Sequence, residues 1–424
     1  MVTAVIIIFV LGYVAIALEQ PLKLNKAASA LITGVLCWTI NIIQSNSPHT
    51  VSDELLHHLG EIASILFFLL GAMTIVELID SHNGFDIITE KINTTSKRKL
   101  LLIVAVITFF LSALLDNLTT TIVMISLASK LLSEKEDRLW FAGMIVIAAN
   151  AGGTWSPLGD VTTTMLWIGG QVTALNIIKE LILPGIAVCL LPTLLIGHRF
   201  KGKRINPVQL PPRTVKEKSD GKIILLAGIG FLVFVPIFKT LTHLPPFMGM
   251  LLALGLMWVI TTIIHKGKEA GLAQKYTVTH ALQKVDSPSI LFFLGILLAV
   301  SALQSLGILK EMADGLNSTL KNDYLIGSAL GLLSAVVDNV PLVAASQGMY
   351  DLSVYPTDHH FWEFLALTTG TGGSAIIIGS AAGVAAMGIE KIDFMWYLKK
   401  IAWLALIGFA AGIAVFLLQI QLGF

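Results

Sequence analysis

The chain has 424 residues, of which 55% are hydrophobic and only 13% are charged. Soluble domains carry about 25% charged residues, so this composition argues against a soluble enzyme and predicts a membrane protein. The formal net charge of +1 gives no indication of a nucleic-acid partner, and none is expected. Both cysteines lie in apolar segments, which argues against a disulfide framework.

Ten apolar segments are long enough to cross a hydrocarbon core of roughly 30 Å as helices. In chain order, the predicted crossings lie at 2–18, 27–43, 60–79, 140–168, 181–198, 223–239, 246–264, 289–306, 361–387 and 396–418. The first is interpreted as a retained helix rather than a removed signal peptide, because no convincing cleavage site follows it. The runs are continuous rather than alternating, which favours helices over a membrane β-barrel.

Two further apolar stretches are interrupted at their middle by an Asp-Asn pair. "SALLDNLTTT" begins at Ser112, and "SAVVDNVPLV" begins at Ser334. Each arm is short for a full crossing. We therefore interpret 97–138 and 325–349 as re-entrant hairpins that reach the middle of the membrane and return to their own side. The alternative is one long kinked helix in each place.

Glycine-rich segments interrupt two of the predicted crossings. "NAGGTWSPLGD" begins at Asn150 within 140–168, and "TTGTGGS" ends at Ser374 within 361–387. Clustered glycines inside an apolar run predict a broken helix, and the unwound backbone of such a helix can offer carbonyl oxygens to a cation. Each half of the chain therefore has one predicted hairpin and one predicted broken helix.

The distribution of basic residues predicts the topology. With the N-terminus outside, only four of the 28 Lys and Arg residues fall outside, which leaves 24 on the cytoplasmic side. The four exceptions are Lys179, Lys239, Lys310 and Lys321. The basic linker 200–222 is then cytoplasmic, and both ends of the chain are outside.

The landmarks recur in the same order in the two halves, 1–199 and 223–424. "FFLLG" at Phe67 matches "FFLG" at Phe292, and the Asp-Asn pairs and glycine-rich segments follow at similar spacing. Five crossings per half is an odd number, so the second copy is expected to be inverted. The sequence predicts an all-α polytopic membrane protein with two inverted repeats, a transporter architecture with its site at mid-membrane.

Polar side chains at the four interruptions form the predicted ion site. Carboxylate, amide and hydroxyl oxygens suit hard monovalent cations, and we expect sodium or lithium at Asp116, Asn117 and Asp160. The full set of candidate ion and proton ligands is Asp116, Asn117, Thr119, Thr120, Asn150, Thr154, Ser156, Asp160, Asp338, Asn339, Thr369, Thr371, Ser374 and Ser380. Each hairpin tip is expected to face the broken helix of its own half, with one pocket per half and the first pocket as the main exchange site.

No Lys or Arg is predicted within about one turn of Asp116, Asp160 or Asp338. A carboxylate at the bilayer centre costs at least roughly 2.5 to 3.5 kcal/mol, so a proton or a cation is expected to neutralise it. A site of this type exchanges the two. Glu77 is a candidate proton relay, with a solvated acid at a helix end as the alternative. An Asp-Asn pair can also simply cap a helix, but the duplicated set argues against that interpretation.

These motifs resemble the NhaD-type sodium/proton antiporters of the ion transporter superfamily, over nearly the whole chain. The resemblance rests on "FFLLGAMTIVELID" (67–80), "LLDNLTTTIVM" (114–124), "ANAGGTWSPLGDVTT" (149–163), "AVVDNVPLVAA" (335–345) and "TGTGGSA" (369–375). Sodium-coupled dicarboxylate carriers of the same superfamily resemble Ser-Asn-Thr at these tips, where this chain has Asp-Asn-Leu and Asp-Asn-Val. The resemblance implies a scaffold domain, a transport domain, a homodimer, and a place in the bacterial inner membrane.

The leading hypothesis is a secondary transporter, not an enzyme, that exchanges cytoplasmic sodium or lithium for external protons in pH homeostasis without a cofactor. Its expected partners are inorganic cations and membrane lipid. A sodium-coupled anion or arsenite carrier of the same fold is the alternative. An intramembrane aspartyl protease is a remote alternative, because "PLGD" at Pro157 superficially resembles such enzymes. That function needs two aspartates sharing a proton. A passive channel is disfavoured by the paired hairpins.

Overall fold

The computed structural model describes residues 2–87, 92, 94–205, 215–266 and 276–423. Within these ranges the chain folds into α-helices and has no β-sheet. The only β-type pairing there is an isolated bridge between Ser96 and Arg204. Eight of the described helices are long and apolar enough to cross a membrane. Apolar side chains on the outer helices are exposed, such as Val35 (58%), Leu226 (60%) and Val259 (56%), as expected where lipid replaces water. The all-α polytopic membrane fold is confirmed.

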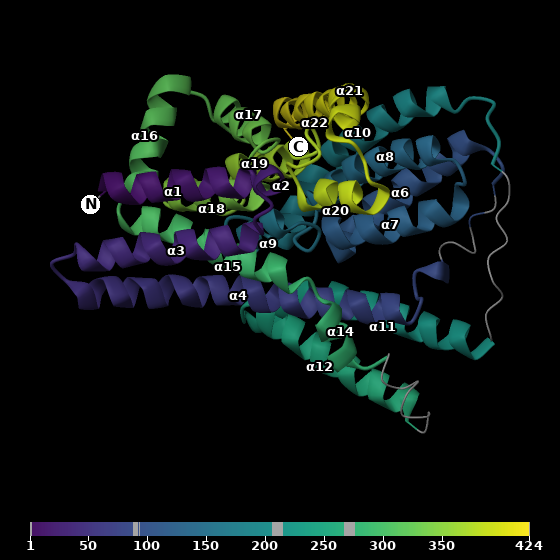
Figure 1. Cartoon of the computed structure of the whole chain (residues 1–424), viewed down its shortest axis with the longest axis horizontal. Helices are drawn as coiled ribbons and strands as arrows, with labels where there is room; N and C mark the ends of the chain where they lie inside the picture. Colours follow the sequence, from purple (N-terminus) through teal and green to yellow (C-terminus); the bar gives the residue numbers. More distant parts are fainter. Residues whose placement is uncertain (1, 88–91, 93, 206–214, 267–275, 424) are drawn as a thin grey trace.

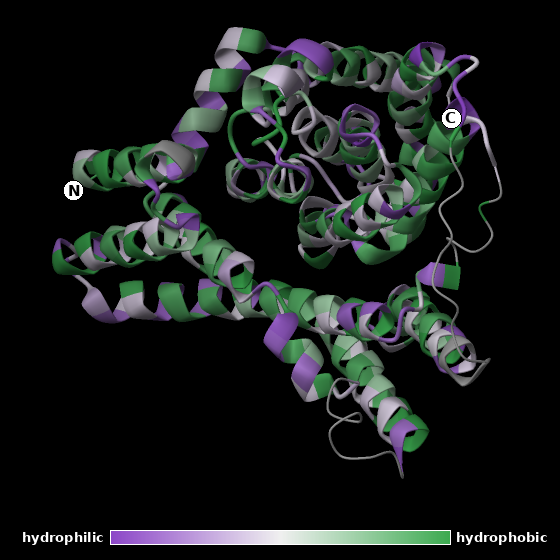
Figure 2. Cartoon of the chain, turned by 45° about the vertical axis from the view of Figure 1, so that its right-hand side comes forward, coloured by the Kyte–Doolittle hydropathy of each residue, from purple (hydrophilic) through white to green (hydrophobic). Residues whose placement is uncertain are grey.

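The helices form two bundles (Figures 1 and 2). The first bundle contains α1 (Val2–Ala17), α3 (Lys26–Ile43), α4 (Pro48–Ser81), α11 (Val215–Thr242), α12 (Pro246–His265) and α15 (Ser287–Ser305), with the short helices α2 (Glu19–Leu22) and α14 (Val278–Lys284) at its edge. The second bundle contains α6 (Lys97–Leu115), α7 (Asn117–Leu131), α8 (Lys135–Gly153), α9 (Val161–Ile168), α10 (Ala174–Arg199), α17 (Asp323–Leu333), α18 (Asn339–Met349), α19 (His360–Gly372), α20 (Ala381–Glu390), α21 (Phe394–Lys400) and α22 (Ala402–Leu422). The remaining helix, α16 (Ile308–Leu320), joins α15 to α17.

Both halves of the sequence contribute to both bundles. In the first bundle α3 packs mainly on α15, and α4 packs on α12 and α15. In the second bundle α10 packs on α22, and α20 packs on α7 and α8. The halves are therefore interleaved in space. The inverted relation between them stays a prediction.

The first hairpin breaks at one residue. Asp116 ends α6 and begins α7, with φ 87° and ψ 158°, a conformation that only glycine adopts readily. The second hairpin is less regular, because α17 ends at Leu333 and α18 begins only at Asn339. In both, the Asp-Asn pair stands where the second arm starts.

The two predicted broken helices are interrupted where the glycines cluster. The first stops being helical after Gly153 and resumes as α9 at Val161. The second stops after Gly372 and resumes as α20 at Ala381. Each half therefore has a hairpin turn and an unwound segment, and these four places lie in the second bundle.

Several element bounds differ from the sequence-based prediction. α4 begins at Pro48 rather than near residue 60, because its first turns are helical but polar and hydropathy does not find them. α11 begins at Val215, inside the predicted linker, whose residues 206–214 lie outside the described part. The predicted crossing 396–418 is divided into α21 and α22 at Ile401. The helix α16 was not predicted, since only one of its faces is apolar.

Two glycines let each hairpin cross its broken helix closely. A methyl group on Gly152 would collide with the carbonyl of Phe109, and one on Gly372 would collide with the carbonyl of Gly331. These are backbone atoms, so relief requires the helices to move apart.

We expect Gly152→Ala to lower the free energy of unfolding by about 1–3 kcal/mol, as overpacking does in other proteins. The measurement is the thermal unfolding midpoint of the purified protein in detergent. Gly230→Ala in α11 is the control, because a methyl group there meets no atom within 4 Å. That variant should keep or raise the midpoint. An equal midpoint for both variants would contradict this prediction. It would mean that the hairpin and the broken helix can move apart without a measurable loss of stability.

Candidate ion-binding site

Four helices begin at the interruptions, and each has a predicted site residue as its N-cap. Asp116 caps α7, Asp160 caps α9, Asp338 caps α18 and Ser380 caps α20. A helix N-terminus carries partial positive charge, which an acidic cap offsets. Three of the four caps are carboxylates, so these N-termini are not bare sites for an anion.

Asp160 is the centre of the polar contacts and is only 2% exposed. One carboxylate oxygen accepts hydrogen bonds from the backbone N–H and the hydroxyl of Thr162, both at 3.0 Å. The other accepts from Asn117 Nδ2 at 2.6 Å and from Asn339 Nδ2 at 3.3 Å. All these donors are neutral: two come from Thr162 in α9, and one comes from each hairpin. The negative charge of Asp160 is therefore solvated by the protein but not neutralised by it.

Asn150 links the two halves from the end of α8. Its Oδ1 accepts from Asn117 Nδ2 at 3.0 Å, and its Nδ2 donates to Ser374 Oγ at 2.8 Å and to Ser380 Oγ at 2.9 Å. Six predicted site residues are thus joined in one network: Asn117, Asn150, Asp160, Asn339, Ser374 and Ser380.

This network corrects the expectation of one separate pocket per half. Asn339 of the second hairpin reaches Asp160 of the first half, and Asn150 reaches the second unwound segment. The physical reason is that both hairpin tips and both unwound segments meet at one place. Their polar groups can then satisfy one another across the halves.

The carboxylates of the two Asp-Asn pairs are held differently. Asp116 accepts from the backbone N–H of Thr119 at 2.7 Å and from the Thr119 hydroxyl at 2.8 Å. Asp338 accepts from the backbone N–H of Val340 at 3.2 Å and lies 3.6 Å from the ammonium of Lys26. The sequence-based expectation that Asp338 has no basic neighbour is wrong, because α3 brings Lys26 to it from far away in the chain.

The side chains of the other predicted hydroxyl ligands make no hydrogen bond to the network among the described residues. Thr154 donates to the Ala151 carbonyl, Thr369 to Leu365 and Thr371 to Leu367, each within its own helix or turn. The Ser156 hydroxyl accepts from the Leu158 backbone N–H at 3.2 Å. The Thr120 hydroxyl is fully buried and has no hydrogen-bond partner among the described residues, which leaves its oxygen available to an ion.

Glu77 lies apart from these contacts, near the end of α4. Its carboxylate is 2.9 Å from the ammonium of Lys284 and accepts from Ser81 at 3.1 Å. The side chain is 22% exposed. This arrangement favours the acid at a helix end over the proton relay.

Sequence reasoning missed three kinds of residue around the network. Thr162 solvates Asp160, and Lys26 pairs with Asp338. Ser112 and Ser334 each tie a hairpin to its broken helix, through the carbonyls of Ala149 at 2.6 Å and Thr369 at 2.8 Å. The repeated serine at the start of both Asp-Asn motifs was a signal for that last role.

Two partly polar hollows lie at opposite ends of α18. One, of about 390 Å³, is lined by Glu19, Lys26 and Asp338 at its start. The other, of about 430 Å³, is lined by His58 and Gln347 near its other end. The polar network and the first hollow both lie at the start of α18, because Asn339 belongs to the network and Asp338 lines the hollow.

Known proteins resemble this chain over almost its full length. A family model described as a citrate transporter matches residues 13–372. Sodium/proton antiporter 1 of Arabidopsis thaliana is 47% identical over 416 residues, which cover 98% of this chain and 72% of that protein. Sodium/proton antiporter 2 of the same plant is 45% identical over 97% of this chain and 98% of its own length. The Na(+)/H(+) antiporter NhaD of Vibrio cholerae is 32% identical over 98% of this chain and 91% of its own length.

The similarity extends across both hairpins, both unwound segments and both bundles. The resemblance drawn from the motifs is confirmed at the level of the family. The relatives include plant proteins, so the bacterial inner membrane stays a prediction. The chain belongs to the transporter family that this model describes and, within it, to the NhaD-type sodium/proton antiporters.

Proposed function

We propose that the chain is a secondary transporter that exchanges cytoplasmic sodium, or lithium, for external protons at the Asp160 network. One observation carries this proposal. The Asp160 carboxylate is buried and accepts only from neutral amide, hydroxyl and backbone donors among the described residues. A buried charge needs a counter-charge, and a metal cation or a proton can supply it. Relatives named as sodium/proton antiporters support the same choice.

Coupling follows from competition at one set of oxygens. Asn117 and Asn339 use their amide nitrogens toward Asp160, so their carbonyl oxygens remain to coordinate a cation. A sodium ion bound there would displace the proton that otherwise neutralises the Asp160 carboxylate. More protons should therefore raise the sodium concentration needed for half-maximal exchange. No cofactor is needed for this step.

The anion carrier is the second candidate, because the matching family model is described as a citrate transporter. Three carboxylate caps at the network disfavour it, since they would repel a dicarboxylate at close range. Among the ion pairs of the described residues, the basic side chain found beside these caps is Lys26, which is paired with Asp338. Among the described contacts of Asp160 there is no second carboxyl, so the geometry gives the protease hypothesis no support.

We expect a homodimer with both chain ends outside, as the resemblance and the basic residues imply. In the scaffold-and-transport interpretation, the bundle of α6–α10 and α17–α22 carries the site. The bundle of α1, α3, α4, α11, α12 and α15 supports it. This division fits the packing of the helices.

The test is exchange by the purified protein in liposomes that enclose a proton gradient, followed with a pH-sensitive dye. Addition of sodium or lithium should dissipate the gradient, and addition of potassium or choline should not. Protein-free liposomes are the control. Sodium-dependent uptake of a radiolabelled dicarboxylate without proton movement would contradict this proposal. It would indicate a sodium-coupled anion symporter instead.

A further inference from the structure

The ammonium of Lys26 lies beside the Asp338 carboxylate. Its Nζ lies 3.6 Å from Asp338 Oδ2 and 4.4 Å from the centre of the Phe292 ring. Lys26 is the first residue of α3 in one bundle, and Asp338 caps α18 in the other. We propose that Lys26 is a tethered competitor of the transported cation: it neutralises Asp338 in the empty site and is displaced when sodium binds. This inference rests on the proposed function.

The contact is loose, as a displaceable partner requires. Charge-assisted hydrogen bonds are about 2.7–2.9 Å long, and the Lys26–Asp338 distance exceeds that range. The side chains are 22% and 15% exposed, so water can take part in the exchange of partners. The pair of Lys97 and Asp137 offers a contrast, because these residues touch directly and their side chains are only 10% and 7% exposed. That pair is built as a fixed link.

The hollow around Lys26 gives the displaced ammonium another place. The same 390 Å³ space is lined by Glu19, whose carboxylate accepts from the backbone N–H of Lys26 at 3.2 Å. The Glu19 carboxylate therefore lies beside the backbone of Lys26, where the flexible Lys26 side chain can fold back to reach it. A released ammonium can exchange one carboxylate for another without losing a counter-charge.

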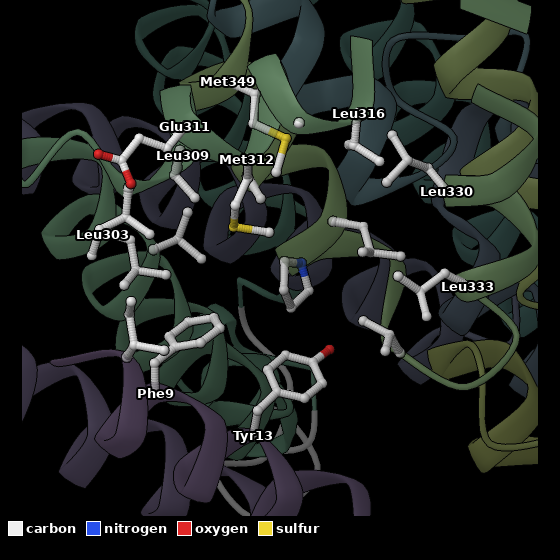
Figure 3. A pocket seen from close by; sticks show the side chains of 18 of the residues that line it. Phe9, Tyr13, Leu303, Leu309, Glu311, Met312, Leu316, Leu330, Leu333 and Met349 are labelled. Carbon is white, nitrogen blue, oxygen red and sulfur yellow. The ribbon is translucent and has the colours of Figure 1, made fainter. Parts of the chain in front are cut away.

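Tyr13 confines this movement to the polar side. It lines both the hollow beside Asp338 and a neighbouring cavity of about 1040 Å³, whose lining is mostly apolar, with Glu311 and Thr319 as its other polar side chains. Figure 3 shows the Tyr13 ring among Phe9, Leu333 and other apolar side chains of that cavity. A charged ammonium would lose its solvation there, so the polar hollow is its favourable path.

The other hairpin has no equivalent. Asp116 is held by Thr119, and no ion pair to it is found in the described part of the chain. The two Asp-Asn pairs therefore differ in their competition with sodium. A cation must displace Lys26 to reach Asp338, whereas only a proton competes at Asp116.

Lys26→Met tests the proposal in the liposome assay. The sodium concentration for half-maximal exchange should fall by about fivefold or more, the lower end of typical coupling between two sites. Lys23→Met is the matched control, because Lys23 is exposed, lies three residues before Lys26 and does not line the hollow. It should leave that concentration unchanged. Lys26→Gln is measured in parallel, so that poor insertion of one variant still leaves a result.

A double-mutant cycle separates competition from a packing effect. In the Asp338→Asn background, Lys26→Met should not lower the sodium concentration for half-maximal exchange any further. The carboxylate for which Lys26 and sodium compete is then absent. Sodium-dependent thermal stabilisation of the purified protein should shift to lower sodium in Lys26→Met by the same factor. An unchanged or raised half-maximal concentration, or a fall that persists without Asp338, overturns the inference. If the unmodified protein itself shows no sodium-dependent proton movement, the proposed function fails instead.

Discussion

Asp160→Asn is expected to abolish sodium-dependent proton exchange, down to the level of protein-free liposomes. Asparagine has the shape of aspartate but no charge, so neither a proton nor sodium is needed to neutralise it. In the described part of the chain Asp160 accepts from both hairpins, from Asn117 at 2.6 Å and from Asn339 at 3.3 Å, so the substitution removes the negative charge at the place where the hairpins meet. No other carboxylate is in a position to take over those contacts among the described residues.

The variant should still fold and insert. The new carbonyl oxygen can accept from Asn117 and Asn339, and the new amide can donate to the Thr162 hydroxyl. The backbone N–H of Thr162 then loses its acceptor, at a cost of about 1–3 kcal/mol for a buried donor. We therefore expect a lower unfolding midpoint but normal levels in the membrane fraction.

Two control variants sharpen this result. Asp314→Asn changes an exposed acid on α16 and should leave exchange as it was. Asp160→Glu keeps the charge but moves the carboxylate by one methylene, so weak exchange that still requires sodium is expected. Wild-type exchange and an unchanged pH profile in Asp160→Asn, together with loss of transport in Asp338→Asn, would place the main site in the second half.

The interruptions of the helices could be predicted from the sequence because their causes are local. An Asp-Asn pair in an apolar run offers a cap for a new helix, and clustered glycines remove the side chains that would favour a continuous one. Asp116 and Asp160 each cap the helix that begins after an interruption. The same local logic failed for the start of α4, where polar residues continue a helix beyond the apolar run.

The partners across the site could not be predicted, because they depend on how distant segments pack. Asn339 reaching Asp160 and Lys26 reaching Asp338 join residues that no local pattern relates. Repeat matching pointed to equivalent residues, such as Asp160 and Ser380, but it could not show that Asn150 connects their two segments. Equivalence in a repeat tells which residues correspond. It does not tell which of them touch.

Asp116→Asn is expected to abolish sodium-induced proton release while the hairpin keeps its shape. The Asp116 carboxylate holds Thr119 through its backbone N–H and its hydroxyl, which is a capping role as well as a charge. Asparagine caps a helix about as well as aspartate, and its side-chain oxygen can keep the bond to the Thr119 backbone. Asparagine has the same shape as aspartate, so it meets the same backbone strain at φ 87° and ψ 158° as the residue it replaces. The variant therefore removes the charge and little else.

Comparison with Asp338→Asn shows whether that charge matters in exchange. Asp338 has Lys26 as a counter-charge at 3.6 Å, whereas Asp116 has none among the described residues. A proton or a cation must therefore neutralise Asp116 in every state of the transport cycle, which ties it to the exchanged ions. Loss of Asp338 should leave reduced but measurable exchange, because a neutral asparagine there removes the target of Lys26 and keeps the Asp160 network. Both variants are compared by the extent of gradient dissipation at saturating sodium and at several pH values. Normal exchange in Asp116→Asn, with the pH profile of the unmodified protein, would remove Asp116 from the site and reduce its role to capping α7.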